Sequence, residues 1–386
     1  IWSDRFMKNR KQETAGNAGA VYSFDYSLLL IVLCLLGFGL LMIYSSSSYT
    51  AQVKFQDSAY FLKKQMLNLL VGIVVMVFVS KIDYRILLKR LPGLHAHLVT
   101  VLYFCAVLLQ LSVYFVGREF NGAKRWLVIG PVSIQPAEIS KIAVLLITAS
   151  FINNAPAMVS HIKGAIRILL AAAVLIVLVG KENLSSAIVM MGIVFIMCFV
   201  AARYKRMYII SMLIVAGLVW MFITFGDSFR MQRIEIWRDV ENNEGGFQIL
   251  QGLYAIASGG LFGTGLGQSM QKLGFIPEPH NDMIFAVICE ELGIVGAGIV
   301  MLMFLILLWR IYDIATTSPD LFSGMICTGV MAQIGVQVLA NIAVVTNTIP
   351  STGISLPFIS YGGSSVIFLL AEIGLVLQIS KKRVKT

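Results

Sequence analysis

Long apolar runs separated by polar segments dominate the chain. A helix needs roughly 20 apolar residues to cross about 30 Å of hydrocarbon, and many of the runs approach or reach that length. We therefore predict an all-α, polytopic membrane protein with about ten transmembrane helices. The second predicted span is short and takes in residues from Phe61 onward. The predicted spans are 26–45, 65–80, 98–116, 138–153, 165–180, 185–202, 207–225, 283–309, 323–345 and 364–380.

The composition agrees with a chain that lies mostly within a lipid bilayer. Of the 386 residues, 58% are hydrophobic and only 13% are charged, which is about half the charged share of a soluble domain. The net charge of +10 therefore concerns the two sides of the membrane, and no nucleic-acid partner is expected. We expect residues 1–22 to be a disordered cytoplasmic tail and 23–386 to form one transmembrane domain. The five cysteines lie inside apolar runs and are expected to be small buried hydrophobic residues.

The positions of Lys and Arg predict the orientation. With the N-terminus inside the cell, 18 of the 30 basic residues fall on inner segments, as the positive-inside rule requires. Both termini are then cytoplasmic. The 117–137 loop and the long 226–282 segment, between the seventh and eighth helices, face outward.

The first polar segment with candidate chemistry extends from the 117–137 loop into the next span. Lys124, Arg125 and Lys141 can form a basic pocket for an anionic lipid head group. Glu138 and Lys141 stand three residues apart at the start of a helix, so they can instead pair on one helix face. A structural ion pair is the preferred interpretation of these two residues.

The second candidate segment begins the long interruption and includes Arg233 and Gln248. A solvated amphipathic helix explains its charges as well as a functional site does. The glycine-rich residues 258–268 that follow permit tight turns and close approach of the backbone to a phosphate. They are not a P-loop, because no Gly-Lys-Ser/Thr follows them.

The third candidate segment places Glu278, His280 and Asp282 directly before a span. Pro277 and Pro279 restrict its backbone, so the segment is expected to have a defined shape. Asp282 can be a simple helix cap or a general base at the mouth of a cavity. His280 is a possible metal ligand, although a lone histidine is more often a structural residue.

The fourth candidate segment, 349–365, contains two prolines, three glycines and five serines between two apolar runs. Irregular backbone at membrane depth is tolerated only where it is buried in protein or lines a wet cavity, so we expect this segment to face substrate. Glu290, Glu291 and Glu372 lie in or near spans and are expected to face the interior, either for pairing or for function.

These segments resemble the SEDS proteins (shape, elongation, division and sporulation), the family that includes FtsW, RodA and SpoVE. The resemblance covers nearly all of the chain after residue 23, in matching order. Residues 350–357 and the Gln271-Lys-Leu segment are more similar to the FtsW/SpoVE branch than to RodA. The matching strings are Gly122-Ala-Lys-Arg-Trp126, Gln135-Pro-Ala-Glu138, Pro277-Glu-Pro-His-Asn-Asp-Met-Ile-Phe285, Glu290-Glu-Leu-Gly293 and Leu356-Pro-Phe-Ile-Ser-Tyr-Gly-Gly-Ser-Ser365.

The resemblance implies an inverting peptidoglycan glycosyltransferase of the bacterial cytoplasmic membrane that polymerises lipid II on the outer face. It also implies a class B penicillin-binding protein transpeptidase and other divisome proteins as partners. The family carboxylate carries over to Asp282 as the catalytic base. A divalent cation (Mg²⁺ or Mn²⁺) and no organic cofactor are expected, with the metal ligands unassigned. The expected substrate-binding residues are Lys124, Arg125, Trp126, Arg233, Gln248, Glu278, His280, Ser360, Tyr361, Gly362, Gly363 and Ser364.

Two segments depart from the family pattern. Lys181-Glu-Asn-Leu-Ser-Ser186 stands where the family has Gln-Pro-Asp-Leu-Gly-Thr, and Asp239…Gly246-Phe-Gln248 replaces Asp-Pro…Gly-Tyr-Gln. Three alternatives to a division polymerase stay open: a lipid II flippase, a RodA-type elongation polymerase, and a scaffold for division enzymes. A flippase can use the same cavity and basic contacts but has no chemical need for the Asp282 carboxylate.

Overall fold

The computed structural model describes residues 20–21, 24–91, 96–120, 123–129, 132–211, 213, 217, 228–381 and 383–384. Within these residues, nine helices are long and apolar enough to cross a membrane, so the protein is a helical, polytopic membrane protein. Each coincides with a predicted span, and the remaining prediction, 207–225, lies largely outside the described residues. The nine are α2 (Tyr26–Phe55), α3 (Tyr60–Val79), α4 (Leu98–Val116), α5 (Pro136–Asn154), α6 (Ile162–Glu182), α7 (Leu184–Ala201), α11 (Ile284–Thr316), α12 (Leu321–Val345) and α13 (Gly363–Ser380).

Local sequence explains where several of these helices begin. The Asp25 carboxylate accepts a hydrogen bond from the Leu28 amide at 2.9 Å and so caps α2. Asp320 and Ser323 form a reciprocal capping box at the start of α12. Pro136 occupies the first turn of α5, where its missing N–H costs nothing.

The predicted outer loops contain short elements of their own. The 117–137 loop folds as an antiparallel sheet, in the order β2 (Arg118–Phe120), β3 (Ala123–Ile129) and β4 (Val132–Ile134), which the apolar pattern did not predict. The 226–282 segment contains α9 (Ser228–Arg238), η3 (Glu244–Gly246) and α10 (Phe247–Gly259). The other short elements are η1 (Tyr84–Leu88), η2 (Pro156–Ser160) and β1 (Ala20–Val21), which pairs with β5 (Arg383–Val384).

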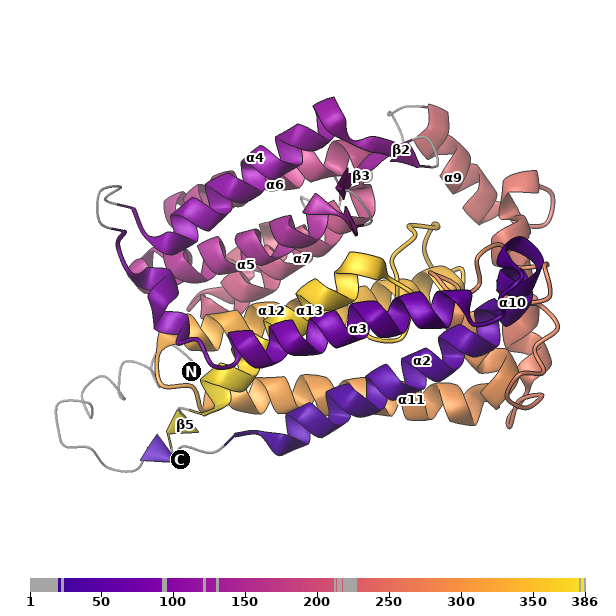
Figure 1. The fold of residues 1–386 in the computed structure, drawn as a ribbon. Coiled ribbons are helices and arrows are strands. Elements are labelled where there is room, and N and C mark those ends of the chain that lie inside the picture. The colour runs from indigo at the N-terminus through magenta and orange to yellow at the C-terminus, as the bar shows by residue number, and fades with distance from the viewer. Residues whose placement is uncertain are drawn as a thin grey trace.

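The long helices lie side by side in one bundle with two distinct ends (Figure 1). One end carries β2, β3, α9 and α10, and we call it the site end. The terminal end carries the first and last described residues. Of the predicted tail, only Ala20–Val21 belongs to the described residues, so that prediction is not tested beyond this strand.

Helix α5 lies at the centre of the bundle, and the outer helices face lipid. Of the 18-residue apolar window of α5, 78% is buried, against 17% for α3. The outer helices expose large apolar side chains, as bilayer-facing helices do. Cys34 and Cys105 are among the exposed residues, which corrects the expectation of buried cysteines, because they lie on the outward faces of α2 and α4; the other three are buried.

The two buried charged groups of α5 pair with each other inside the bundle. Lys141 Nζ lies 2.9 Å from Glu138 Oε2, and both residues are buried. Glu372 of α13 is also buried, accepts a hydrogen bond from Gln333 of α12 at 2.8 Å and interacts electrostatically with both members of the pair. Lys141 is therefore a structural residue of the core and does not join Arg125 in a surface pocket, contrary to that interpretation of the sequence.

Helix α11 is broken at Gly293, where a loop crosses it. Gly293 has φ 68° and ψ −171°, outside the helical region. The carbonyls of Gly260 and Leu261 accept hydrogen bonds from the amides of Ile294 and Val295, at 3.0 and 3.1 Å. The break lets the loop after α10 approach the α11 backbone directly.

We predict that Gly293→Ala destabilises the protein by about 1–3 kcal/mol, because a side chain is strained in this backbone conformation. The new Cβ would also lie 2.4 Å from the Leu261 carbonyl oxygen and 2.5 Å from the Gly263 amide nitrogen. The control is Gly298→Ala in the same helix, where a Cβ meets nothing within 4 Å. Thermal unfolding in detergent measures both variants, and equal melting temperatures would contradict the constraint.

We also predict that Lys141→Met destabilises the protein by roughly 3–5 kcal/mol, because it leaves a buried carboxylate without its cation. Adding Glu138→Gln should recover part of this loss. The matched control is Lys63→Met, because Lys63 pairs with Asp57 at 2.7 Å but its side chain is 69% exposed. An exposed pair contributes about 1 kcal/mol or less. The same thermal assay measures all three variants, and a silent Lys141→Met would show that the buried pair has no structural importance.

Candidate active site

Asp282 lies at the site end, directly before α11. The helix begins at Ile284 with Met283 as its N-cap, and no side chain caps it. Asp282 is therefore not the helix cap that the sequence allowed, because it lies one residue too early. The residue is partly exposed, and its carboxylate accepts one long hydrogen bond, 3.4 Å, from the Gln248 side chain of α10.

The electrostatic surroundings of Asp282 make its carboxyl a better proton acceptor than an ordinary aspartate. Burial raises the pKa of Asp282 above its usual 3.8, and the neighbouring Glu278 carboxylate raises it further. Its own backbone amide and the Gln248 side chain act in the opposite direction. Glu278 has φ 47° and accepts a hydrogen bond from Asn281 at 2.7 Å.

A single buried side chain, Asn341 of α12, joins Asp282 to the 349–362 segment. Its amide nitrogen donates to the Asp282 carbonyl at 2.8 Å and to the Ile354 carbonyl at 2.7 Å. Gly353, with φ 68°, brings this segment close, since a Cβ there would lie 3.7 Å from the Asp282 carboxylate. Sequence reasoning missed Asn341, although a lone amide inside an apolar span is a recognisable signal.

Two arginines lie near each other at the site end, and one of them, Arg233, bonds to this segment. Arg125 of β3 donates to the Glu182 carbonyl at 2.7 Å, and Arg233 of α9 donates to the Ser351 carbonyl at 3.2 Å. Burial lowers the pKa of both arginines, and the charge of Arg125 lowers that of Arg233 further. Two partly desolvated cations this close favour an anion between them.

Residues 181–186, which depart from the family pattern, still help to build this region. The Ser185 hydroxyl donates to the Thr352 carbonyl, and the Glu182 carbonyl holds Arg125. The Trp237 indole of α9 donates to the Asn347 carbonyl at 3.0 Å. Residues 347–353 are therefore held by side chains of α7 and α9.

His280 lies in an aromatic cluster rather than on the surface. Its ring centroid is 4.2 Å from that of Phe61 and 5.5 Å from that of Tyr361, and its carbonyl accepts from the Tyr361 amide at 2.9 Å. Burial, with a smaller contribution from Lys54, lowers the pKa of His280 to about 4, so the ring is neutral at pH 7. The cluster packs the start of α3 against His280 and Tyr361.

The remaining predicted substrate-binding residues of the 360–364 turn make contacts within the protein. The Ser360 hydroxyl accepts from the Leu356 amide at 2.8 Å, and Ser364 accepts from the Gln135 amide at 3.3 Å. Gly362 donates to the Gln65 side chain at 3.4 Å and, as N-cap, precedes Gly363, the first residue of α13. Trp126 is partly buried in β3, and the side chain of Lys124 lies outside the described residues.

Glu290 and Glu291 face the interior, as the sequence predicted, and belong to a buried polar cluster that holds the glycine-rich loop. Lys272 lies 2.7 Å from Glu291, and the Ser45 hydroxyl of α2 donates to the same carboxylate at 2.6 Å. The Glu290 carboxylate accepts from the Ser269 hydroxyl at 2.5 Å and from the Met270 amide at 2.8 Å. The sequence indicated only the two acids, at the start of an apolar run. It did not indicate their partners Lys272, Ser45 and Ser269.

Most of the chain is similar in sequence to known proteins. A family profile described as cell cycle protein, FtsW/RodA/SpoVE, matches residues 26–385. Stage V sporulation protein E of Bacillus subtilis (strain 168) is 37% identical over 369 residues, which cover 92% of this chain and 97% of that protein. A probable peptidoglycan glycosyltransferase FtsW from Geobacter metallireducens is 34% identical over 373 residues, covering 95% and 97%.

Solved structures agree with the sequence relatives. One chain, from a structure described as "Structural coordination of polymerization and crosslinking by a peptidoglycan synthase complex", has a TM-score of 0.78 at 26% identity and covers 94% of this chain and 99% of its own. RodA of Thermus thermophilus has a TM-score of 0.68 at 26% identity with the same coverage. The resemblance read from the sequence motifs is confirmed, and the chain belongs to the FtsW/RodA/SpoVE family of cell cycle proteins.

Proposed function

We propose that this membrane protein is a peptidoglycan glycosyltransferase that polymerises lipid II with inversion at the donor carbon. Relatives named as probable peptidoglycan glycosyltransferases support the reaction class. The observation that carries the assignment in this chain is the Asp282 carboxylate, which has a raised pKa and faces the segment to which Arg233 bonds. A division or sporulation role agrees with relatives named FtsW and SpoVE.

The geometry divides the reaction between a base and an anion site. Asp282 accepts the proton of the acceptor sugar hydroxyl while the hydroxyl oxygen forms its bond to the donor carbon. The bond from that carbon to the pyrophosphate oxygen breaks, and the electron pair leaves with the pyrophosphate. Arg125 and Arg233 stabilise the departing negative charge, because partly desolvated guanidinium groups interact strongly with phosphate. A single inversion needs one base and no covalent intermediate.

A divalent cation is compatible with the residues present, and Asp282 and Glu278 would hold it. Their carboxylates are close enough to affect one another electrostatically, and Mg²⁺ is commonly bound by one or two carboxylates together with substrate phosphates. Within the described residues no group of three His, Cys, Asp or Glu side chains surrounds a metal position. When bound, the ion would add positive charge beside the pyrophosphate. Chelation should then reduce polymerisation, and added Mg²⁺ or Mn²⁺ should restore it.

We further propose a bacterial cytoplasmic membrane location, with both termini cytoplasmic and the site end outside. The partners would be a class B penicillin-binding protein and other division proteins. A structural relative described as a peptidoglycan synthase complex that coordinates polymerization and crosslinking supports a transpeptidase partner. The 18 to 12 bias of Lys and Arg supports the orientation.

The first functional prediction is that Asp282→Asn lowers polymerisation by about 10²–10⁴-fold, the usual contribution of a general base. The fold should survive, since the hydrogen bond that the carboxylate accepts from Gln248 is long and an amide oxygen can also accept it. Glu278→Gln should have a milder effect, because Glu278 only raises the pKa of Asp282 and can assist a cation. The assay is glycan-strand length from purified lipid II, with the chain co-purified with its transpeptidase.

The pH dependence of the wild type gives an independent check. Because burial raises the pKa of Asp282, its basic form is lost at a higher pH than for an ordinary aspartate. The rate should fall on acidification with a midpoint above 3.8, and Asp282→Asn should lack this limb. If Asp282→Asn folds and polymerises at the wild-type rate, Asp282 is not the general base, and the flippase alternative is favoured.

The second functional prediction concerns orientation. With Cys34 and Cys105 replaced by Ala, Asn242→Cys at the site end should react with an impermeant maleimide in intact cells. Lys89→Cys, exposed before α4, should react only after permeabilisation. The reverse pattern would contradict cytoplasmic termini.

A further inference from the structure

The segment between η3 and the Asp282 loop has no exposed charge. From residue 245 to residue 277 the chain contains one charged residue, Lys272. Lys272 is only 4% exposed, and its ammonium is bound to Glu291. A stretch of this length outside the spanning helices would normally carry several charges on its surface.

The same segment exposes large apolar side chains on a loop that we call the apolar loop, residues 260–275. Phe262 is 79% exposed, and Leu261 and Met270 are each more than 60% exposed. A loop in water rarely presents so much apolar surface unless something covers it. The exposed large apolar residues of the loop are Leu261, Phe262, Leu266, Met270, Leu273 and Phe275.

This exposure is a fixed feature of the fold, since the loop backbone is bound tightly to α11. The amides of Thr264 and Gly265 donate to the carbonyls of Glu290 and Glu291 at 2.9 and 3.0 Å. The Glu290 carboxylate holds the Ser269 hydroxyl and the Met270 amide. The polar groups of the loop bond to α11, whereas its large apolar side chains are exposed.

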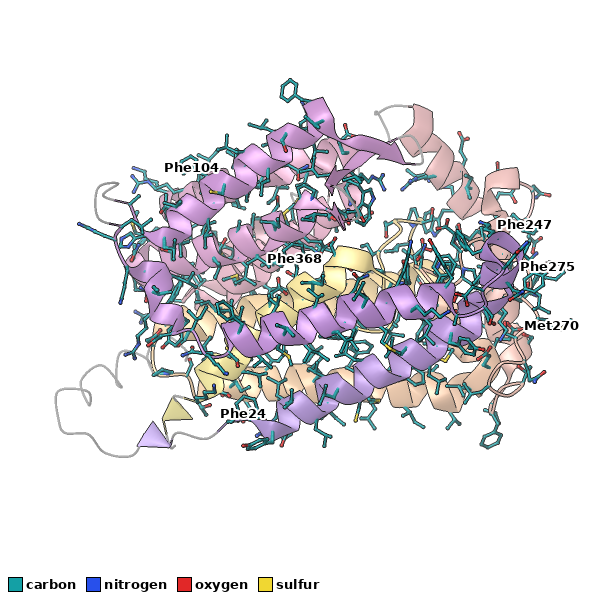
Figure 2. All side chains as sticks on the ribbon, viewed as in Figure 1. Phe24, Phe104, Phe247, Met270, Phe275 and Phe368 are labelled. Carbon is teal, nitrogen blue, oxygen red and sulfur yellow. The ribbon has the colours of Figure 1, made fainter. Side chains whose placement is uncertain are left out.

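The position of the apolar loop is at the start of a membrane span. It meets α11 at Ile294 and Val295, and the unbroken helix from there to Thr316 has 23 residues, about 34 Å at 1.5 Å per residue. That length is enough to cross the hydrocarbon core, so the loop lies near one hydrocarbon boundary. Figure 2 shows Phe247, Met270 and Phe275 at this end of the bundle, beside α10.

The apolar surface of the loop continues the lipid-facing surface of α11. Ile294 and Val295, bonded directly to the loop backbone, are themselves 62% and 46% exposed. A protein partner would be expected to meet a polar or charged rim around an apolar centre. The absence of exposed charge in the loop favours acyl chains as the occupant.

We propose that the apolar loop inserts into the lipid leaflet at the site end, with its apolar side chains among the acyl chains. It would act as an interfacial anchor beside a spanning helix, in the way that apolar faces bind at the boundary between head groups and acyl chains. The loop leads directly into residues 276–282, and the Ile276 amide donates to the Gln271 carbonyl at 2.9 Å. Insertion therefore sets the depth of Asp282 relative to the leaflet, whatever reaction Asp282 performs.

The test is fluorescence quenching of the full chain in phosphatidylglycerol/phosphatidylethanolamine vesicles. Phe262→Cys carries a bimane label in a background with Cys34 and Cys105 replaced by Ala. Nitroxide-labelled lipids report contact with acyl chains, and iodide on both sides of the vesicle reports contact with water. The water control is Asn242→Cys, exposed after α9, and the lipid control is Leu305→Cys, 61% exposed on α11.

We expect nitroxide lipids to quench the label at 262 at least half as strongly as at 305, with at least threefold less iodide quenching than at 242. Met270→Cys, labelled in the same way, should behave like 262 and provides a second site if the first variant folds poorly. Iodide quenching at 262 equal to that at 242 would overturn the proposal. Shielding of 262 from both quenchers would also overturn it, because a protein surface and not lipid would then cover the loop.

Discussion

The absence of water inside the bilayer is the constraint on which this structure depends. A polar group that a helix brings into the bundle is costly unless it finds a partner within the protein. Asn341 meets this requirement by bonding two carbonyls, and in doing so it joins Asp282 to the 349–362 segment. The same requirement pairs Lys141 with Glu138 and Lys272 with Glu291. The buried polar contacts thus hold the site as well as the core.

The site separates a basic carboxylate from a pair of cations across one segment of irregular backbone. Asp282 lies beside this segment just before α11, Arg233 of α9 bonds to it, and Arg125 of β3 lies near Arg233. Like charges that are partly buried are costly, and Asp282 and Arg233 each lie beside a group of the same sign. Glu278 acts on Asp282, and Arg125 acts on Arg233. A substrate that gives a proton to Asp282 and places negative charge beside Arg233 would remove both repulsions.

The motifs that carried the family resemblance divide between chemistry and packing. Asp282 faces the site, whereas His280 is enclosed by aromatic rings and the Ser360 and Ser364 hydroxyls bond to backbone amides. The resemblance assigned Asp282 to catalysis and His280, Ser360 and Ser364 to substrate, because a motif does not distinguish a residue that touches a ligand from one that shapes the turn beside it. Burial and hydrogen-bond partners make that distinction.

The sequence by itself determined the class of fold and the positions of the nine described spans, because hydrophobicity over about 20 residues is a local property. It also indicated the Glu138–Lys141 pair, whose spacing of three residues is set by the helix itself. It did not determine the contact between Asn341 and Asp282, 59 residues apart, or the meeting of Arg125 with Arg233. It also missed the sheet in the 117–137 loop and the Lys272–Glu291 pair. These features depend on which helices become neighbours, and only the packing of the whole bundle decides that.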